Sequence, residues 1–280
     1  MCDESIDAAN ARRRPATEYA KRSRKPSVHL IDGLPIASTK VNVVTPDGQA
    51  DAFYAGPTAG KHPAILIWPD VTGLRNAFEQ MGRRLAGSGY AVLVVNQYYR
   101  WTKVPFLMPG EDWRQPDVRA RMAPWHEGLT HEAISRDADA LISWLDQQEA
   151  VDKTRGAAST GYCIGAKMAM ISAASRPDRI RAGASFHGAG LISNKPDSPH
   201  NLVRKMNADF LFAIAENDNK RQPDEKDIII AAFAAANREA EVEVFAGALH
   251  GWCPPDNAVY NEEQAEVAWE RQLALLKRVL

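Results

Sequence analysis

The stretch Ser159-Thr160-Gly161-Tyr162-Cys163-Ile164-Gly165-Ala166 decides the fold, because it has the Gly-x-Cys-x-Gly form of a nucleophile elbow with sulfur in place of a hydroxyl. The small residues at 156–160 suit the end of a buried strand, and the Ala, Met and Ile at 164–175 predict a helix. Glycines on either side remove the side chains that would clash in so sharp a turn. Cys163 is therefore expected at its tip, near the positive end of the helix, where a thiolate is favoured.

The length and composition indicate an ordinary globular protein. A chain of 280 residues can form one large α/β domain, and its net charge of -1 gives no field that would attract nucleic acid or an anionic membrane. No apolar run approaches the roughly 20 residues that span a bilayer. Three cysteines are too few for a disulfide framework and have no zinc-like spacing, so neither a metal nor another cofactor is expected. No secretory signal is visible, and a working thiol favours the reducing cytoplasm.

Residues 1–29 are predicted to be a flexible basic tail. They hold seven Lys and Arg against four Asp and Glu, which leaves a charge of +3. A transit peptide is the alternative, although acidic residues so close to Met1 disfavour it. Residues 30–280 are expected to form a single domain.

The order of apolar runs predicts strands that alternate with helices. A Pro46-Asp47-Gly48 turn between apolar runs predicts a β-hairpin. The continuous apolar runs at 64–68 and 91–95 flank a helical stretch at 76–87, and strand–helix–strand units form parallel sheets. Further strands and helices follow in alternation. We therefore expect an α/β fold with a mostly parallel central sheet of about seven to eight strands and helices on both faces. Further strands are predicted at 181–186, 208–215 and 241–245, and further helices at 129–148, 225–238 and 261–280.

Residues 97–128 interrupt this alternation with four prolines and three tryptophans. A long irregular segment inside a compact domain is usually functional or mobile, so we expect a cap or lid beside the site. The alternative is an ordinary packed excursion whose tryptophans are buried against the body.

Four polar residues follow the ends of predicted strands: Asp70, Cys163, Asp218 and His250. In open α/β sheets, ligands bind outside the carboxyl ends of the strands. The chain order nucleophile, acid, base is the order that α/β-hydrolases use. The sequence therefore predicts that these residues share one site.

Their chemistry suggests roles in acyl transfer. Cys163 would attack an acyl carbonyl as the thiolate, and His250 would take the thiol proton and later activate water. Asp218 would orient the imidazole. The backbone N–H groups of Val71 and Ile164 would form the oxyanion hole.

Each of these residues also has a structural interpretation. His250 could be a buried histidine, and Asp218 and Asp70 could be turn residues. His187 ends a predicted strand, where it could line the pocket or serve only in packing. Cys253, three residues after His250, is given no role.

The Gly-Tyr-Cys-Ile-Gly motif, the Asp218 position and His250-Gly251-Trp252 together resemble the dienelactone hydrolase family, which consists of thiol enzymes with the α/β-hydrolase fold. The resemblance runs from about Val41 to the C-terminus. It implies cleavage of an enol-lactone or related ester through a cysteinyl acyl-enzyme, without a metal. Trp252 is expected beside the substrate, a small-molecule ester or lactone. Monomer and dimer both remain open.

Three positions depart from the family pattern. Asp70 stands where the family has a Glu that holds or takes the resting thiol's proton, so the geometry must shift by about 1 Å if that role survives. Arg100 matches one of the two arginines that bind the substrate carboxylate, but Pro254 stands at the position of the other. Ala166 replaces a glycine. The dienelactone itself is therefore not the expected substrate.

Two other kinds of function fit the same residues. The fold could be a non-catalytic binding protein or a redox-responsive one, with Cys163 as a sensor thiol. The enzyme could instead transfer its acyl group to another acceptor or cleave peptides, which depends on whether residues 97–128 exclude water.

Overall fold

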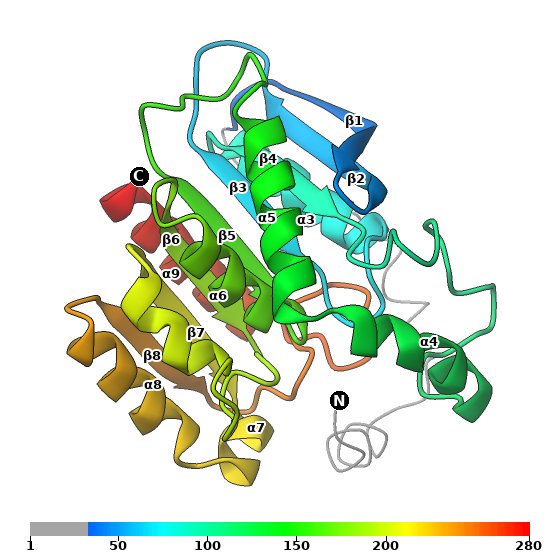
Figure 1. Cartoon of the computed structure of the whole chain (residues 1–280), viewed down its shortest axis with the longest axis vertical. Coiled ribbons are helices and arrows are strands. Elements are labelled where there is room, and N and C mark those ends of the chain that lie inside the picture. Colours follow the sequence, from blue (N-terminus) through cyan, green and yellow to red (C-terminus); the bar gives the residue numbers. More distant parts are fainter. Residues whose placement is uncertain (1–32) are drawn as a thin grey trace.

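One eight-stranded sheet forms the centre of the computed structural model, which describes residues 33–280 (Figure 1). The strand order is β1-β2-β4-β3-β5-β6-β7-β8. β2 is antiparallel to both β1 and β4, and all the other neighbours are parallel. The predicted tail at 1–29 lies outside the described residues. The strands are β1 (Ile36–Thr45), β2 (Gly48–Pro57), β3 (Ala64–Trp68), β4 (Ala91–Val95), β5 (Ala157–Tyr162), β6 (Ile180–Phe186), β7 (Asp209–Ala215) and β8 (Ala240–Phe245).

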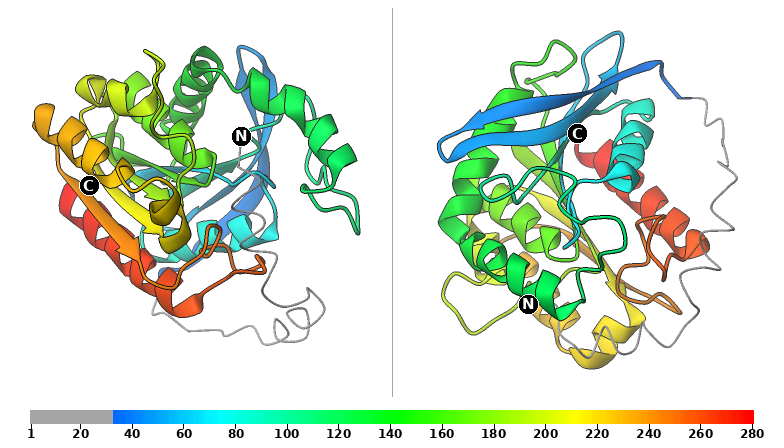
Figure 2. Two further views of the ribbon diagram at one scale, coloured as in Figure 1. Left: turned by 90° about the horizontal axis from the view of Figure 1, so that it is seen from below. Right: turned by 90° about the vertical axis from the view of Figure 1, so that its right-hand side faces the viewer.

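Helices cover both faces of this sheet (Figure 2). Buried side chains of α5, α6 and α8 pack on one face, and those of α3 and α9 pack on the other. The predicted α/β fold, with a mostly parallel sheet between helices, is therefore confirmed. The helices are α3 (Asn76–Gly87), α4 (Pro116–Gly128), α5 (His131–Leu145), α6 (Gly165–Ser175), α7 (Glu216–Arg221), α8 (Glu225–Ala235) and α9 (Glu262–Val279), with a 3-10 turn η1 (Pro199–Lys205).

The local patterns in the sequence explain the central elements. Thr45 pairs with Gly48 at the end of the β1–β2 hairpin, and Gly48 has a φ of 136°, which favours glycine. All five residues of β3 and of β4 are buried, as continuous apolar runs predict for strands covered on both faces. The hairpin and the helix at Asn76–Gly87 lie where the sequence predicts them.

The predicted irregular segment at 97–128 is wrong in its second part, because Pro116–Gly128 is the helix α4. Pro116 occupies the first turn, where a missing N–H removes no helical hydrogen bond. Pro124 lies inside the helix, and because a proline in a helix interior removes a hydrogen bond, the sequence pattern does not predict a helix here. Trp125 packs with its ring 5.6 Å from that of Tyr98, so part of the segment is fixed against the body.

Smaller differences occur at element ends. Asp218, expected in a polar loop, lies in the short helix α7. The sequence pattern does not predict the turn η1. Across residues 33–280, no helix combines the length and the apolar character that crossing a membrane requires.

Candidate active site

The turn between β5 and α6 is an elbow that only glycines on both sides permit. Cys163 at its tip has a φ of 53°, a left-handed conformation that is uncommon for a side-chain-bearing residue. A Cβ on Gly161 would lie 2.1 Å from the carbonyl oxygen of Gly165, and one on Gly165 would lie 2.2 Å from that of Trp68. The Cys163 N–H donates to the Phe186 carbonyl at 3.1 Å. The backbone therefore holds the sulfur at the carboxyl end of β5, directly before α6.

Three side chains from distant parts of the chain meet at this elbow. The Nε2 atom of His250 lies 3.2 Å from the Sγ atom of Cys163. On the other side of the ring, Nδ1 lies 2.7 Å from Oδ2 of Asp218. Because an ionised carboxylate only accepts hydrogen bonds, Nδ1–H donates to Asp218 and Nε2 is left to accept the thiol proton. The Asn217 side chain accepts a hydrogen bond from the His250 backbone N–H at 2.8 Å, which fixes the loop after β8.

His187 and Trp252 lie behind the imidazole of His250. The fully buried ring of His187 meets His250 edge-to-face with centroids 5.0 Å apart, and Trp252 at 5.3 Å. Burial, followed by the proximity of His250, lowers the pKa of His187 well below its usual value, so its ring is neutral. Trp252 is 0% exposed and stacks on Phe245. The structure therefore places Trp252 in the core, which supports a packing role in place of the predicted contact with substrate.

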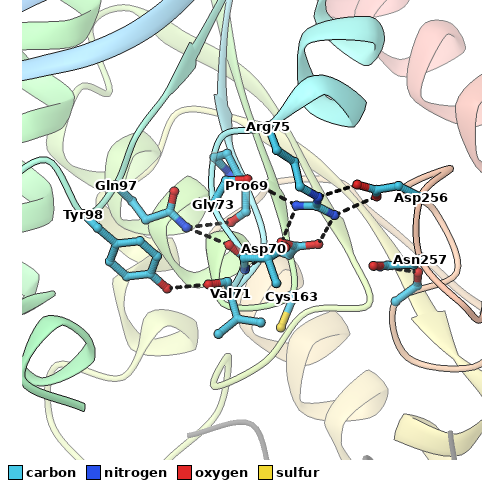
Figure 3. A network of polar contacts seen from close by, with 12 residues as sticks. Pro69, Asp70, Val71, Gly73, Arg75, Gln97, Tyr98, Cys163, Asp256 and Asn257 are labelled. Atoms are coloured by element: carbon cyan, nitrogen blue, oxygen red, sulfur yellow. Dashed lines mark hydrogen bonds and ion pairs between the residues drawn. The ribbon is translucent and has the colours of Figure 1, made fainter. Parts of the chain in front are cut away.

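The loop after β3 carries the predicted oxyanion-hole residue Val71 and is held by two side chains from the end of β4 (Figure 3). Nε2 of Gln97 donates to the carbonyl of Asp70 at 2.7 Å. The hydroxyl of Tyr98 donates to the carbonyl of Val71 at 3.1 Å. Gln97 lies two residues after the end of the predicted strand at 91–95. Its place at the carboxyl end of a parallel strand is the signal by which the sequence could have marked it as a residue near the site.

Asp70 is engaged by Arg75 and by its own loop (Figure 3). Its carboxylate accepts hydrogen bonds from both terminal nitrogens of Arg75, at 2.8 and 3.0 Å, and from the N–H and hydroxyl of Thr72. Arg75 also binds Asp256, in the loop after His250, at 2.6 and 2.9 Å. Burial lowers the pKa of Arg75, but these two carboxylates more than reverse the effect and raise it above its usual value. Asp70 therefore lies in the predicted loop, but its carboxylate is paired with Arg75, which the sequence pattern does not identify as part of the site.

The guanidinium of Arg100 contacts residues away from the elbow. It forms ion pairs with Asp47 at 2.6 Å and with the buried Asp137 at 2.7 Å. The hydroxyl of Tyr99 donates to the same Asp137 at 2.6 Å. These contacts link the β1–β2 turn to α5, so the arrangement favours a structural role for Arg100 over the predicted substrate contact.

A cavity of about 500 Å³ lies between α4 and the elbow. Its wall includes Val71 and Ile164, the two predicted oxyanion-hole residues, which the structure thus brings together. Met122 and Leu129 line it from α4 and the residue that follows. The second part of the predicted cap therefore lies beside the site, whereas its movement as a lid stays a prediction.

Neither a metal cluster nor a second reactive thiol accompanies this site within residues 33–280. No group of three or more His, Cys, Asp and Glu residues there could hold a metal ion. Cys253 is a buried free cysteine, and burial raises the pKa of its thiol well above the usual value, which keeps it protonated.

The mostly parallel sheet, with a nucleophile elbow after β5 and an acid and a histidine after β7 and β8, defines an α/β-hydrolase fold. Within that class, the chain belongs to the dienelactone hydrolase family, whose family model matches residues 50–280. This confirms the resemblance seen in the sequence.

Individual relatives agree with this membership. A Salmonella typhi protein named "Putative carboxymethylenebutenolidase" is 26% identical over 257 residues, which cover 88% of this chain and 88% of that protein. A Bradyrhizobium protein named "Probable 2-oxo-3-(5-oxofuran-2-ylidene)propanoate lactonase" is 24% identical over 253 residues, covering 86% and 94%. The crystal structure of a "Putative Dienelactone Hydrolase" from Klebsiella pneumoniae has a TM-score of 0.75 at 22% identity and covers 87% of this chain and 99% of that one, which shows the shared fold.

Proposed function

We propose that this protein hydrolyses a small carboxylic ester or lactone through a cysteinyl acyl-enzyme, with Cys163, His250 and Asp218 as the catalytic triad. One observation carries the proposal: the imidazole of His250 lies 3.2 Å from the Cys163 sulfur on one side and 2.7 Å from the Asp218 carboxylate on the other. These are the distances at which a base can activate a nucleophile. Family membership and the names of the relatives support the ester and lactone substrate class.

The first half of the reaction forms the acyl-enzyme. Nε2 of His250 takes the Cys163 proton, and the thiolate attacks the carbonyl carbon to form a C–S bond. The backbone N–H groups of Val71 and Ile164 stabilise the oxyanion. The imidazolium, held by Asp218, then gives its proton to the departing oxygen as the C–O bond breaks.

The second half returns the free thiol. His250 takes a proton from water, and the resulting hydroxide attacks the acyl carbon. The C–S bond breaks, the acid product leaves, and the proton returns to sulfur. In a lactone the departing oxygen stays attached to the acyl group, so a single ring-opened acid is released. The scheme uses only residues of this chain and requires no cofactor. A thiol nucleophile suits a reducing compartment, so the cytoplasm is part of the proposal.

The alternative of a sensor thiol has less support. Redox-sensing thiols are accessible to solvent, whereas Cys163 is 3% exposed and lies against an imidazole that is itself held by a carboxylate. Nucleophilic catalysis requires a thiol, an imidazole and a carboxylate that are oriented towards one another, whereas oxidation of a thiol does not require them.

Steady-state hydrolysis of 4-nitrophenyl acetate tests the proposal. Cys163→Ala and His250→Ala are each expected to lower kcat by at least about 10³-fold, because the two groups act as a unit. Cys253→Ala, which alters the other described thiol, is the matched control and should retain turnover. Mass spectrometry of the quenched reaction should find the acetyl group on Cys163. Unchanged turnover in either triad variant, with the fold retained by circular dichroism, would rule the mechanism out.

A further inference from the structure

A buried glutamine holds the peptide group that carries the N–H of Val71. The peptide bond between Asp70 and Val71 is trans, so its C=O and N–H point in opposite directions. Nε2 of Gln97 donates to the Asp70 carbonyl at 2.7 Å (Figure 3). The Val71 N–H points away from this contact, and among residues 33–280 no oxygen atom accepts from it. Because Val71 lines the cavity beside the elbow, this N–H can donate to a ligand there.

The same loop packs directly against the elbow. A Cβ added to Gly165 would lie 2.5 Å from the carbonyl oxygen of Pro69, the residue before Asp70. The loop therefore touches the turn that carries Cys163, and the missing side chain of Gly165 permits the approach. Rotation of the peptide group after Asp70 would move its N–H relative to the sulfur. Catalysis is sensitive to displacements of about 1 Å, so the orientation of this group matters.

The hydrogen bond from Gln97 also strengthens the Val71 N–H as a donor. A carbonyl that accepts a hydrogen bond draws electron density from its amide nitrogen, and linked hydrogen bonds polarise one another in this way. The effect is larger where water is excluded, and Gln97 is 0% exposed and Asp70 4% exposed. Gln97 is thus placed to set both the direction and the strength of one donor.

The amide of Gln97 is only half satisfied, which argues against a purely structural role. Its Oε1 atom is buried and has no hydrogen-bond partner within residues 33–280. The reverse orientation would bring Oε1 against the carbonyl oxygens of Asp70 and Pro69, and two acceptors form no hydrogen bond. The Asp70 carbonyl also accepts from the Gly73 N–H at 2.9 Å, so it keeps a partner without Gln97. Since an unpaired buried acceptor costs stability, an apolar side chain of similar size would serve the fold at least as well.

We propose that Gln97 is a positioning residue for the oxyanion hole. It acts through the Asp70 carbonyl to orient and polarise the Val71 N–H, which stabilises the oxyanion that forms on the substrate. The proposal rests on the proposed hydrolase function and deepens it, and it requires no contact between Gln97 and the substrate. The tetrahedral intermediates of both halves of the reaction carry this oxyanion, so kcat should depend on Gln97 whichever half is slower.

Gln97→Met removes the donor with little change in side-chain volume. Deleting an oxyanion-hole donor lowers kcat by about 10²–10³-fold, and a donor that is kept but less well held should cost less. We expect kcat for 4-nitrophenyl acetate to fall about tenfold with KM within about twofold, and the urea midpoint of unfolding to be unchanged or higher. Gln272→Met is the matched control, because Gln272 is also 0% exposed and donates to Thr160 at 2.9 Å, with its Oε1 unpaired in the described part of the chain. It should leave kcat within about twofold.

Gln97→Glu adds a readout that a purely structural role would not give. A protonated Glu side chain can donate its O–H to the Asp70 carbonyl, whereas an ionised one only accepts. Burial raises the pKa of such a carboxyl, so the donor is present at low pH and is lost as the pH rises. The kcat of Gln97→Glu, divided by that of the unaltered protein, should therefore be higher at about pH 5.5 than at about pH 9. The same ratio for Gln97→Met should not change with pH. Asp70 and Arg75, the charged groups of the loop, are the same in every variant, so their titration cancels.

Two probes of Cys163 separate the oxyanion hole from the triad. Iodoacetamide alkylates the thiolate with loss of iodide and forms no oxyanion, so its rate in Gln97→Met should stay within about twofold. The carbonyl carbon of 1,1,1-trifluoroacetone forms a C–S bond with the thiolate, while the thiol proton passes to His250 and the negative charge moves to the carbonyl oxygen. The inhibition constant of this ketone should rise about tenfold in Gln97→Met.

Three results would overturn the proposal: an unchanged kcat in Gln97→Met, a pH-independent ratio in Gln97→Glu, or alkylation by iodoacetamide that slows as much as hydrolysis. Failure of the unaltered protein to hydrolyse any ester would instead contradict the proposed function. The ketone then decides the role of Gln97 by itself, measured as protection of Cys163 from iodoacetamide. Equal protection in the unaltered protein and in Gln97→Met would refute the role independently of turnover.

Discussion

Replacing Arg75 with methionine removes the cation that joins the loop after β3 to the loop after His250. The side chain of Asp70 is 6% exposed and that of Arg75 is 21% exposed, so the change leaves an almost buried carboxylate without its charge partner. Breaking a buried ion pair in this way costs about 3–5 kcal/mol. Because one fifth of Arg75 reaches solvent, we expect a loss near the lower end, about 3 kcal/mol of unfolding free energy.

Two further variants separate the charge effect from the rest. Asp256 is 45% exposed, and removing an exposed partner costs less than about 1 kcal/mol, which makes Asp256→Asn the matched control. In the double variant Arg75→Met/Asp70→Asn no unpaired charge is buried, so most of the lost stability should return. Met keeps aliphatic contact with Phe78, over which the guanidinium of Arg75 lies at 4.8 Å.

Urea denaturation followed by tryptophan fluorescence measures these free energies. The coupling between Arg75 and Asp70 is the departure of the double variant from additivity. The reasoning is refuted if Arg75→Met costs no more than Asp256→Asn, or if Asp70→Asn restores nothing. The same variant should lower kcat for 4-nitrophenyl acetate by about 10²-fold, since a displacement of about 1 Å at the loop that carries Val71 has that effect.

Three other outcomes are expected. Asp218→Asn should lower kcat by at least about 10²-fold by favouring the wrong imidazole tautomer, with Asp227→Asn as the exposed control, and a kcat within about threefold of the unaltered protein would contradict the role. Burial, and then the charge of Asp218, raises the pKa of Glu225 from 4.5 to about 7. The contribution of Glu225 to the stability of the fold should therefore decline as the pH rises from about 4.5 to 7. Glu225→Gln should therefore raise Tm at about pH 8 and change it little at about pH 4.5, unlike the exposed control Glu270→Gln, and a pH-independent difference would count against this. Gly165→Ala should abolish activity or folding, since its Cβ would lie 2.2 Å from a backbone carbonyl oxygen, and a fully active variant would disprove the elbow argument.

Much of the fold could be predicted because its elements are encoded locally. The continuous apolar runs of β3 and β4 and the glycine-flanked elbow each specify their conformation within a few residues. The helix α4 could not be predicted because Pro124 breaks the helical pattern. Its formation depends instead on contacts such as that of Trp125 with Tyr98 and Phe106 from another part of the chain.

The candidate site also has a part that the sequence predicts and a part that it does not. Cys163, Asp218 and His250 could be predicted to share a site because each comes after the end of a strand, and parallel strands end at one edge of the sheet. The direction in which a charged side chain points is not encoded by such spacing. The family pattern predicts that Arg100 faces the substrate, but two carboxylates from other elements hold it.

The sequence by itself determined the order of the strands along the chain, the elbow and the candidates for nucleophile, base and acid, because periodicity, glycine and residue chemistry are local properties. Only the tertiary structure decided which carboxylates pair with the arginines that follow β3 and β4. Arg75 reaches Asp256 across 181 positions of the chain, and Arg100 pairs with Asp47 and Asp137 from other elements. The physical reason is that charge pairing depends on distances in space, and sheet order with helix packing sets those distances.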